Sequence, residues 1–163
     1  SLIALYSASG IYHFSRAAAN VLVVLRKLDH AMIYVLIAGT YTPLLLGLLP
    51  APRAEVFTAV IWGVALAGIV MKLCWINAPR WLGTTLYLLL GWAIAIDLPA
   101  LAALPVPAVA LLAAGGLLYT AGGLIYMIKR PNLSERFGFH EIFHLFVIAG
   151  SLCHYFLVLL YIA

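Results

Sequence analysis

Residues 98–128 read LPALAALPVPAVALLAAGGLLYTAGGLIYMI, a run of 31 residues without a Lys, Arg, Asp or Glu. In a helix that rises 1.5 Å per residue, about 20 apolar residues cross the hydrocarbon core of a bilayer, which is roughly 30 Å thick. Two further charge-free runs, of 23 and 22 residues, cover 30–52 and 142–163. These lengths predict an all-α protein, a polytopic bundle of transmembrane helices.

The composition of the whole chain supports the same class. Of its 163 residues, 66% are hydrophobic and only 9% are charged, and the mean hydropathy is +1.14. Soluble surfaces need roughly a quarter of their residues charged, so a soluble enzyme, a disordered chain and a conventional DNA-binding domain are excluded. The net charge of +4 is dispersed between apolar blocks, so we expect membrane lipids and no nucleic acid as partners. The oligomeric state stays open.

Six helical segments are expected, all within a single integral membrane domain over residues 1–163. The segments 56–75 and 81–96 qualify as spans if Lys72 extends its ammonium group to the membrane interface. Residues 1–13 cover only about 20 Å as a helix, so we expect the chain to start partway along a membrane helix. The segments are separated by proline-rich turns, which also end helices, at 50–52, 77–79, 98–107 and 129–132.

The basic residues are divided unequally between the connections. Consecutive spans alternate in direction, and eight of the nine basic residues lie in or beside the odd-numbered connections, against Arg53 alone in the others. Because Lys and Arg are retained in cytoplasmic loops, we expect the odd connections in the cytoplasm and the C-terminus outside. The eight are Arg16, Arg26, Lys27, Lys72, Arg80, Lys129, Arg130 and Arg136.

Three histidines from opposite ends of the sequence fall near this same expected face. His13 ends the first segment, and His140 and His144 open the last. Residues at i and i+4 project from one side of a helix, so the last two imidazoles are neighbours. Three neutral histidines and a water form the open geometry of a catalytic zinc site, where the pKa of the water falls towards 7. The sequence therefore predicts a Zn²⁺ site formed by His13, His140 and His144.

Asp29 and Ser9 are the candidate catalytic residues beside this site. Asp29 opens the second segment, where its carboxylate could accept a proton from the bound water. Ser9 precedes His13 by four residues and shares its helix face. Each also has a plainer interpretation, since Asp is a favoured helix N-cap and Ser is a common small packing residue in membrane helices.

Two other histidines are expected to have different roles. His30 faces about 100° away from Asp29 on a helix, so we expect it to be hydrogen bonded rather than to bind a metal. His154 lies about 15 Å further along its helix than His144, too far to complete the same site. We expect it to be a polar contact inside the bundle.

The last histidine pair also matches a protease motif. Residues 140–144 read HEIFH, the H-E-x-x-H pattern in which two histidines bind zinc and the Glu acts as general base. On this hypothesis Glu141 is the base of an intramembrane metalloprotease, and Asp29 or His13 supplies the third ligand.

Several further motifs stand in a fixed order along the chain: SGIYH at 9–13, RKLDH at 26–30, IAGTYTP at 37–43, LY at 86–87 with GW at 91–92, GGLLYTAG at 115–122 and HEIFHLFVIAGS at 140–151. Together these motifs resemble bacterial hemolysin III proteins, the bacterial branch of the progestin and adipoQ receptor family, which is related to the alkaline ceramidases. The resemblance covers essentially the whole chain in the right order.

The resemblance implies a seven-helix fold with zinc near the cytoplasmic face, of which the six segments here correspond to helices two to seven. The family's ligands match His13, His140 and His144, its Asp near the zinc-bound water matches Asp29, and its Ser matches Ser9. Related members carry Gln where Glu141 stands, which argues against the protease.

The resemblance further implies a zinc-dependent hydrolase-like protein of the bacterial inner (plasma) membrane, acting on a lipid amide or ester and involved in membrane homeostasis. A non-enzymatic, zinc-holding receptor-like or membrane-homeostasis protein is the first alternative. The intramembrane protease is the second.

Overall fold

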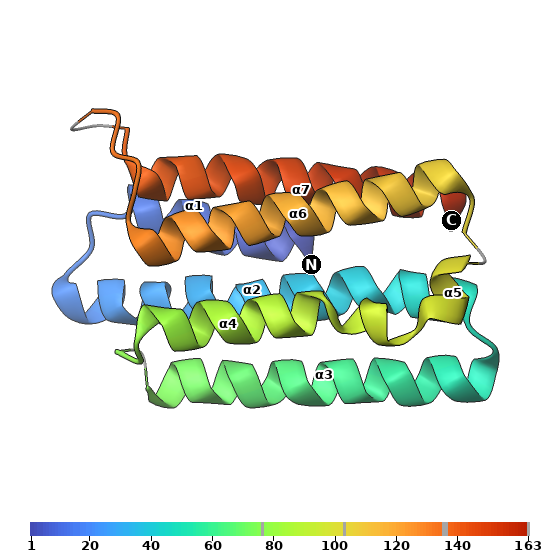
Figure 1. Ribbon diagram of the computed structural model, residues 1–163. Coiled ribbons are helices and arrows are strands. Elements are labelled where there is room, and N and C mark those ends of the chain that lie inside the picture. Colours follow the sequence, from blue (N-terminus) through green and yellow to red (C-terminus); the bar gives the residue numbers. More distant parts are fainter. Residues whose placement is uncertain (76, 103, 135–136, 163) are drawn as a thin grey trace. The chain divides into compact units, whose positions relative to one another are not determined.

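The computed structural model describes residues 1–75, 77–102, 104–134 and 137–162. Within these ranges the chain is helical and has no strands (Figure 1). It forms two compact units, Ser1–Pro79 and Arg80–Ala163, which are described one at a time. The single domain over residues 1–163 stays a prediction. The helices are α1 (Leu2–Phe14), α2 (Ala19–Leu48), α3 (Ala51–Cys74), α4 (Arg80–Gly91), the 3₁₀ helix η1 (Ala93–Ile96), α5 (Leu98–Ala102), α6 (Val106–Ile128) and α7 (Phe139–Tyr161).

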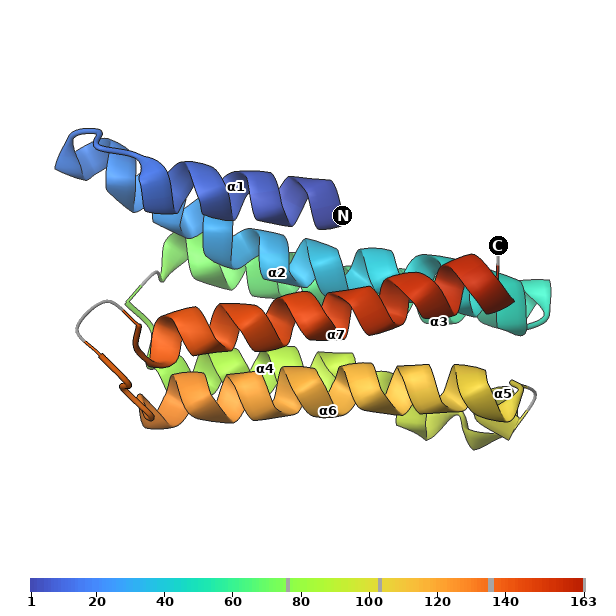
Figure 2. The same ribbon diagram turned by 90° about the horizontal axis from the view of Figure 1, so that it is seen from above.

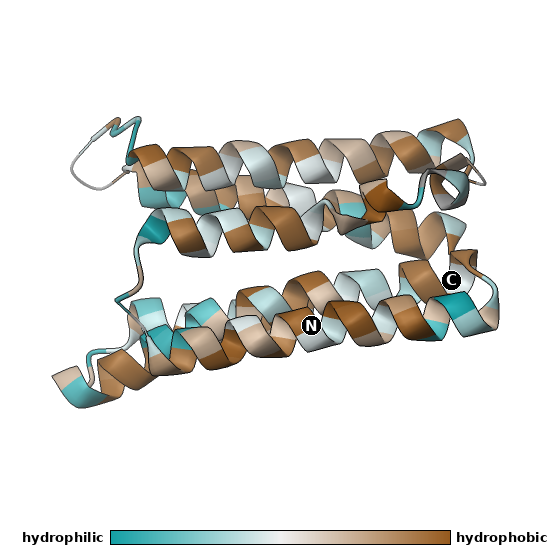
Figure 3. Cartoon of the chain, turned by 60° about the horizontal axis from the view of Figure 1, so that its bottom comes forward, coloured by the Kyte–Doolittle hydropathy of each residue, from teal (hydrophilic) through white to brown (hydrophobic). Residues whose placement is uncertain are grey.

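Four of these helices, α2, α3, α6 and α7, are long and apolar enough to cross a membrane. Hydrophobic residues cover most of their length (Figure 3). On α3, Val56, Val60 and Val64 follow one another at four-residue spacing and are all exposed, as expected for a face that contacts lipid instead of water. The predicted polytopic helical membrane fold is confirmed.

In the first unit, α2 is the helix that contacts both α1 and α3 (Figure 2). The ring of Tyr34 on α2 occupies the space beside Gly68 on α3, where a Cβ atom would overlap it. Trp62 on α3 donates a hydrogen bond from Nε1 to Thr42 Oγ1 on α2, at 3.1 Å. Small residues let helices approach closely in lipid, where packing rather than burial from water drives association.

In the second unit, α6 packs along α7 and also contacts α4 (Figure 2). A Cβ added at Gly115 or Gly122 of α6 would overlap His154 or Phe146 of α7. At Gly150 of α7 the added atom would meet Tyr119 of α6. The glycine-rich stretch at 115–123 therefore serves close helix packing, as its sequence predicts.

The second predicted span starts earlier than its charge-free run. α2 begins at Ala19 and its N-cap is Ala18, so Arg26 and Lys27 lie inside the helix rather than in a connection. Asp29 is also interior, and the N-cap interpretation of this residue is wrong. At 30 residues α2 is about 45 Å long, which exceeds the roughly 30 Å hydrocarbon core, so its charged first turns extend beyond that core.

Three further details differ from the sequence expectation or lie outside it. Lys72 is only 4% exposed, so its side chain is largely covered by the protein. The segment 81–96 is not one helix, because α4 ends at Gly91 and η1 follows. Trp92, between them, donates a hydrogen bond from Nε1 to Thr120 Oγ1 of α6, at 3.0 Å. Arg136, one of the basic residues of the last connection, lies outside the described residues.

Within each unit, the parts of different helices that lie beside the odd-numbered connections come together at one end. Lys27 of α2 donates a hydrogen bond from Nζ to Leu73 O of α3, at 2.6 Å, so the third turn of α2 lies beside the end of α3. In the second unit, the Arg80 guanidinium at the start of α4 lies 5.2 Å from the ring centre of Tyr126 on α6 and 5.7 Å from that of Phe139 on α7. Alternation of the spans therefore places these connections as predicted inside each unit.

Candidate metal centre

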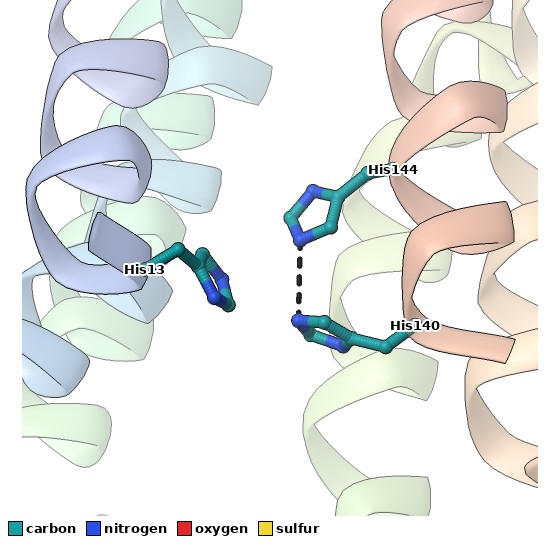
Figure 4. Close-up of side chains that lie close together, drawn as sticks. All are labelled: His13, His140 and His144. Carbon is teal, nitrogen blue, oxygen red and sulfur yellow. Dashed lines mark hydrogen bonds between the residues drawn. The ribbon is translucent and has the colours of Figure 1, made fainter. Parts of the chain in front are cut away.

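His140 and His144 lie on the first two turns of α7, with their imidazoles facing each other (Figure 4). The two Nε2 atoms are 3.2 Å apart. The ring centres are 4.6 Å apart and the ring planes are nearly perpendicular, at 86°. Both side chains are half-buried. The sequence prediction that the pair shares one helix face is confirmed.

The spacing of the pair fits two ligands of one metal ion. Zn–N bonds of 2.0–2.1 Å at a tetrahedral centre place neighbouring ligand nitrogens about 3.3 Å apart, close to the 3.2 Å between His140 Nε2 and His144 Nε2. Ligation through both Nε2 atoms requires the imidazole protons to be on Nδ1. The same distance also fits a hydrogen bond in which one Nε2–H donates to the other ring. Imidazole pairs bind several divalent ions, so the geometry supports a metal site without selecting zinc.

The loop before α7 fixes the start of the helix that bears the pair. Asn132 Oδ1 accepts a hydrogen bond from Phe139 N at 3.0 Å, while its Nδ2 donates to Lys129 O at 3.2 Å. These bonds connect the end of α6 to the first residue of α7. A helix start otherwise leaves unpaired N–H groups, so Asn132 both satisfies one of them and positions His140.

Glu141 takes part in the same helix start. Its Oε2 accepts a hydrogen bond from Gly138 N at 2.8 Å, as the third helical residue does in a capping box. The side chain is exposed. This contact gives Glu141 a structural role that does not require it to be the base of a protease.

Aromatic rings surround His140. The ring centres of Tyr126 and Phe143 lie 6.1 Å and 6.2 Å from the imidazole centre. Tyr126 is itself covered by the Arg80 guanidinium. Such rings restrict the orientation of an imidazole and lower the local polarity, both of which favour metal ligation.

The other predicted site residues all belong to the first unit. His13 is exposed on the last turn of α1, with its ring centre 4.8 Å from that of Tyr12. Ser9 is one turn earlier and 9% exposed, and Asp29 of α2 is 8% exposed. Each imidazole of His13, His140 and His144 offers one ligand nitrogen. A joint site of all three stays a prediction, as do the catalytic roles of Asp29 and Ser9.

His30 is hydrogen bonded, as predicted. Its Nδ1 donates to Arg26 O, one helical turn earlier, at 2.8 Å. The same nitrogen lies 3.6 Å from Asp29 Oδ2. The backbone carbonyl therefore orients the imidazole beside the carboxylate.

A second polar cluster lies between α6 and α7, further along α7. The Nε2 of His154 donates to Leu112 O at 3.3 Å, and its ring centre is 5.2 Å from that of Tyr119. Tyr119 Oη and Ser151 Oγ are hydrogen bonded at 2.9 Å. The polar contact expected of His154 is confirmed. The sequence did not predict that Tyr119 and Ser151 belong to this cluster. Ser151 follows His144 by seven residues and therefore lies on the same face of α7 as His144.

The fold and the histidine pair together define a helical integral membrane protein with two neighbouring imidazoles at one end of a membrane helix. The family model described as "Haemolysin-III related" matches residues 1–155, and the chain belongs to this family. The resemblance seen in the sequence motifs is therefore confirmed.

Two curated relatives support the same assignment. The chain is 38% identical over 162 residues to the hemolysin-3 homolog of Bacillus subtilis (strain 168), a match that covers 99% of this chain and 73% of the relative. It is also 38% identical over 136 residues to hemolysin-3 of Bacillus cereus, covering 83% and 60% of the two chains. No solved structure matches.

Proposed function

We propose that this protein is a zinc-dependent, hydrolase-like membrane protein that acts on a lipid amide or ester and contributes to membrane homeostasis. The observation that carries the proposal is the 3.2 Å separation of His140 Nε2 and His144 Nε2, which suits two ligands of one zinc ion. His13 is the proposed third ligand. Zinc bound in this way supplies an activated water and polarises the acyl carbonyl.

The chain's own residues would move the proton and hold the substrate. Asp29 is buried on α2, and the Nδ1–H of its neighbour His30 donates to Arg26 O rather than to the carboxylate. The oxygens of Asp29 can therefore accept a proton from a water or return it to a leaving group. Ser9, on the face of α1 that bears His13, would hold the water or the developing oxyanion through its hydroxyl.

We place the protein in the bacterial plasma membrane, with the metal site towards the cytoplasm and the C-terminus outside. The clustering of basic residues at one end of each unit supports this orientation. Lys27 meets Leu73 in the first unit, and Arg80 meets Tyr126 and Phe139 in the second. By the positive-inside rule these ends are cytoplasmic.

The test is turnover of the purified, zinc-loaded protein against a panel of ceramides and phospholipids, with fatty-acid release as the readout. We expect release by the wild type and a loss of 100-fold or more, on the order of general-base effects, in Asp29→Asn. Zinc content should be unchanged in that variant. Glu55→Gln removes an exposed carboxylate of α3 and should leave turnover unchanged.

A non-enzymatic receptor-like or homeostasis protein is the alternative, because the same histidine pair can hold zinc for structure or sensing. It predicts wild-type protein that binds zinc and hydrolyses no lipid in the panel. That result would contradict the enzymatic proposal directly.

A further inference from the structure

Lys72 is a buried cation near the end of α3, with 4% of its surface exposed. Its charged electrostatic neighbour is Arg26 of α2, a second cation. Among the described residues, no carboxylate lies within ion-pair distance of Lys72. A largely covered cation beside a second cation is costly in a membrane protein unless an anion accompanies the pair.

The local carboxylate does not balance this charge. Asp29 lies on α2 near Arg26, but its Oδ2 is 3.6 Å from His30 Nδ1 and forms no ion pair with Lys72. This end of the first unit carries four cations, Arg16, Arg26, Lys27 and Lys72, against Asp29 alone. The excess of positive charge lies at this end of the first unit.

The two helices are fixed to each other next to these cations. Lys27 donates a hydrogen bond from Nζ to Leu73 O, the residue after Lys72, at 2.6 Å. Trp75, which caps α3, is 52% exposed, as is typical of a tryptophan at a membrane interface. The cations therefore lie at the depth of lipid headgroups, between helices that hold a defined spacing.

We propose that Arg26 and Lys72 form an anion site between α2 and α3 that binds the phosphoryl group of an anionic lipid. An Arg guanidinium binds phosphoryl oxygens in a bidentate manner, and a Lys ammonium adds a compact point charge. Basic pockets between transmembrane helices on the cytoplasmic side are typical binding sites for anionic headgroups. The site does not include His13, His140 or His144 and does not depend on the proposed hydrolysis.

The test measures the thermal unfolding of the full chain, purified in detergent, during titration with phosphatidylglycerol or phosphatidylcholine. Phosphatidylglycerol should raise Tm, and phosphatidylcholine should not. We expect its apparent affinity to fall about fivefold to tenfold in Lys72→Gln and in Arg26→Gln. Lys72→Arg keeps the charge and should stay close to wild type. Arg53→Gln removes a charge from the opposite end of α3 and should leave the affinity unchanged.

A parallel titration with inorganic phosphate identifies the source of the phosphoryl group. Protection by millimolar phosphate that competes with phosphatidylglycerol supports the same site, with free phosphate as a second ligand. Protection by the lipid alone supports a headgroup site.

Three outcomes would overturn the proposal. The first is an equal rise of the wild-type Tm with the two lipids and no rise with phosphate. This outcome needs no variant, so it can be read even if the Lys72 variants fail to fold. The second is an equal loss in Arg53→Gln and Lys72→Gln, which would indicate a general charge effect. The third is a Lys72→Met variant that is more stable than wild type and keeps its lipid response, which would indicate a neutral, buried amine.

Discussion

His140 Nε2 and His144 Nε2 lie 3.2 Å apart on successive turns of α7. Two imidazoles at this distance either share a proton or share a metal ion. The two states differ in which ring nitrogens carry hydrogen and in the metal content of the purified protein. Measuring the metal content therefore distinguishes a shared proton from a shared metal ion.

Removing either member of the pair should abolish stoichiometric metal binding. We expect about one zinc per chain in the wild type, as for a three-histidine site, and little in His140→Ala or His144→Ala. Elemental analysis by inductively coupled plasma mass spectrometry provides the measurement. His154→Ala is the control, since it removes an imidazole from the same helix that hydrogen bonds Leu112 O instead.

His13→Ala tests the third ligand separately. Loss of zinc in this variant supports a site formed by three histidines. Full zinc retention here, with loss in the other two variants, would contradict the role of His13, and zinc retention in all three would contradict the site itself.

Glu141→Gln separates the capping role from the protease hypothesis. A Gln side chain can still accept the hydrogen bond from Gly138 N, which Glu141 Oε2 accepts at 2.8 Å, so stability should change little. Glu141→Ala should cost about 1 kcal/mol of unfolding free energy. Lipid hydrolysis should persist in Glu141→Gln, whereas a metalloprotease would lose all peptide cleavage.

Two glycines of α3 should respond oppositely to the same substitution. A Cβ at Gly68 would overlap the Tyr34 ring, whereas one at Gly63 meets nothing within 4 Å. Gly68→Ala should therefore cost about 1–3 kcal/mol through overpacking, and Gly63→Ala should be neutral or stabilising by up to about 1 kcal/mol. Denaturant titration in detergent gives both values. Equal effects would contradict the close approach of α2 to α3.

The hydroxyl groups of Tyr119 and Ser151, which lie between α6 and α7, should stabilise the protein jointly. Tyr119→Phe and Ser151→Ala each remove the 2.9 Å hydrogen bond between their oxygens and should each cost about 1 kcal/mol. The double variant should cost less than the sum of the two. Strict additivity in the measured unfolding free energies would show that the two groups do not interact.

The sequence predicted the membrane helices and the histidine pair because both depend on regular spacing. A charge-free run of sufficient length can cross a bilayer in few ways other than as a helix. The i to i+4 spacing of His140 and His144 then brings their side chains together whatever the rest of the chain does.

Helix bounds and the burial of Lys72 depend on tertiary packing and could not be predicted from the same patterns. Counting charges locates the part of α2 in hydrocarbon but not its start at Ala19, because a helix continues through polar headgroups. The burial of Lys72 arises where α3 packs on α2. α4 ends before Trp92, whose indole donates a hydrogen bond to Thr120, 28 residues away in the sequence.

The short turn between α2 and α3 has a consequence for membrane insertion. Only Leu49 and Pro50 separate the two helices, so we expect them to leave the translocon together as a helical hairpin. Near the start of α3, directly after the turn, lie Arg53 and Glu55, the only Lys, Arg, Asp or Glu residues between His30 and Lys72. Their charges cancel, which lowers the electrostatic cost of moving this turn across the bilayer. In the proposed orientation the four cations at the other end stay on the cytoplasmic side and so set the direction of insertion.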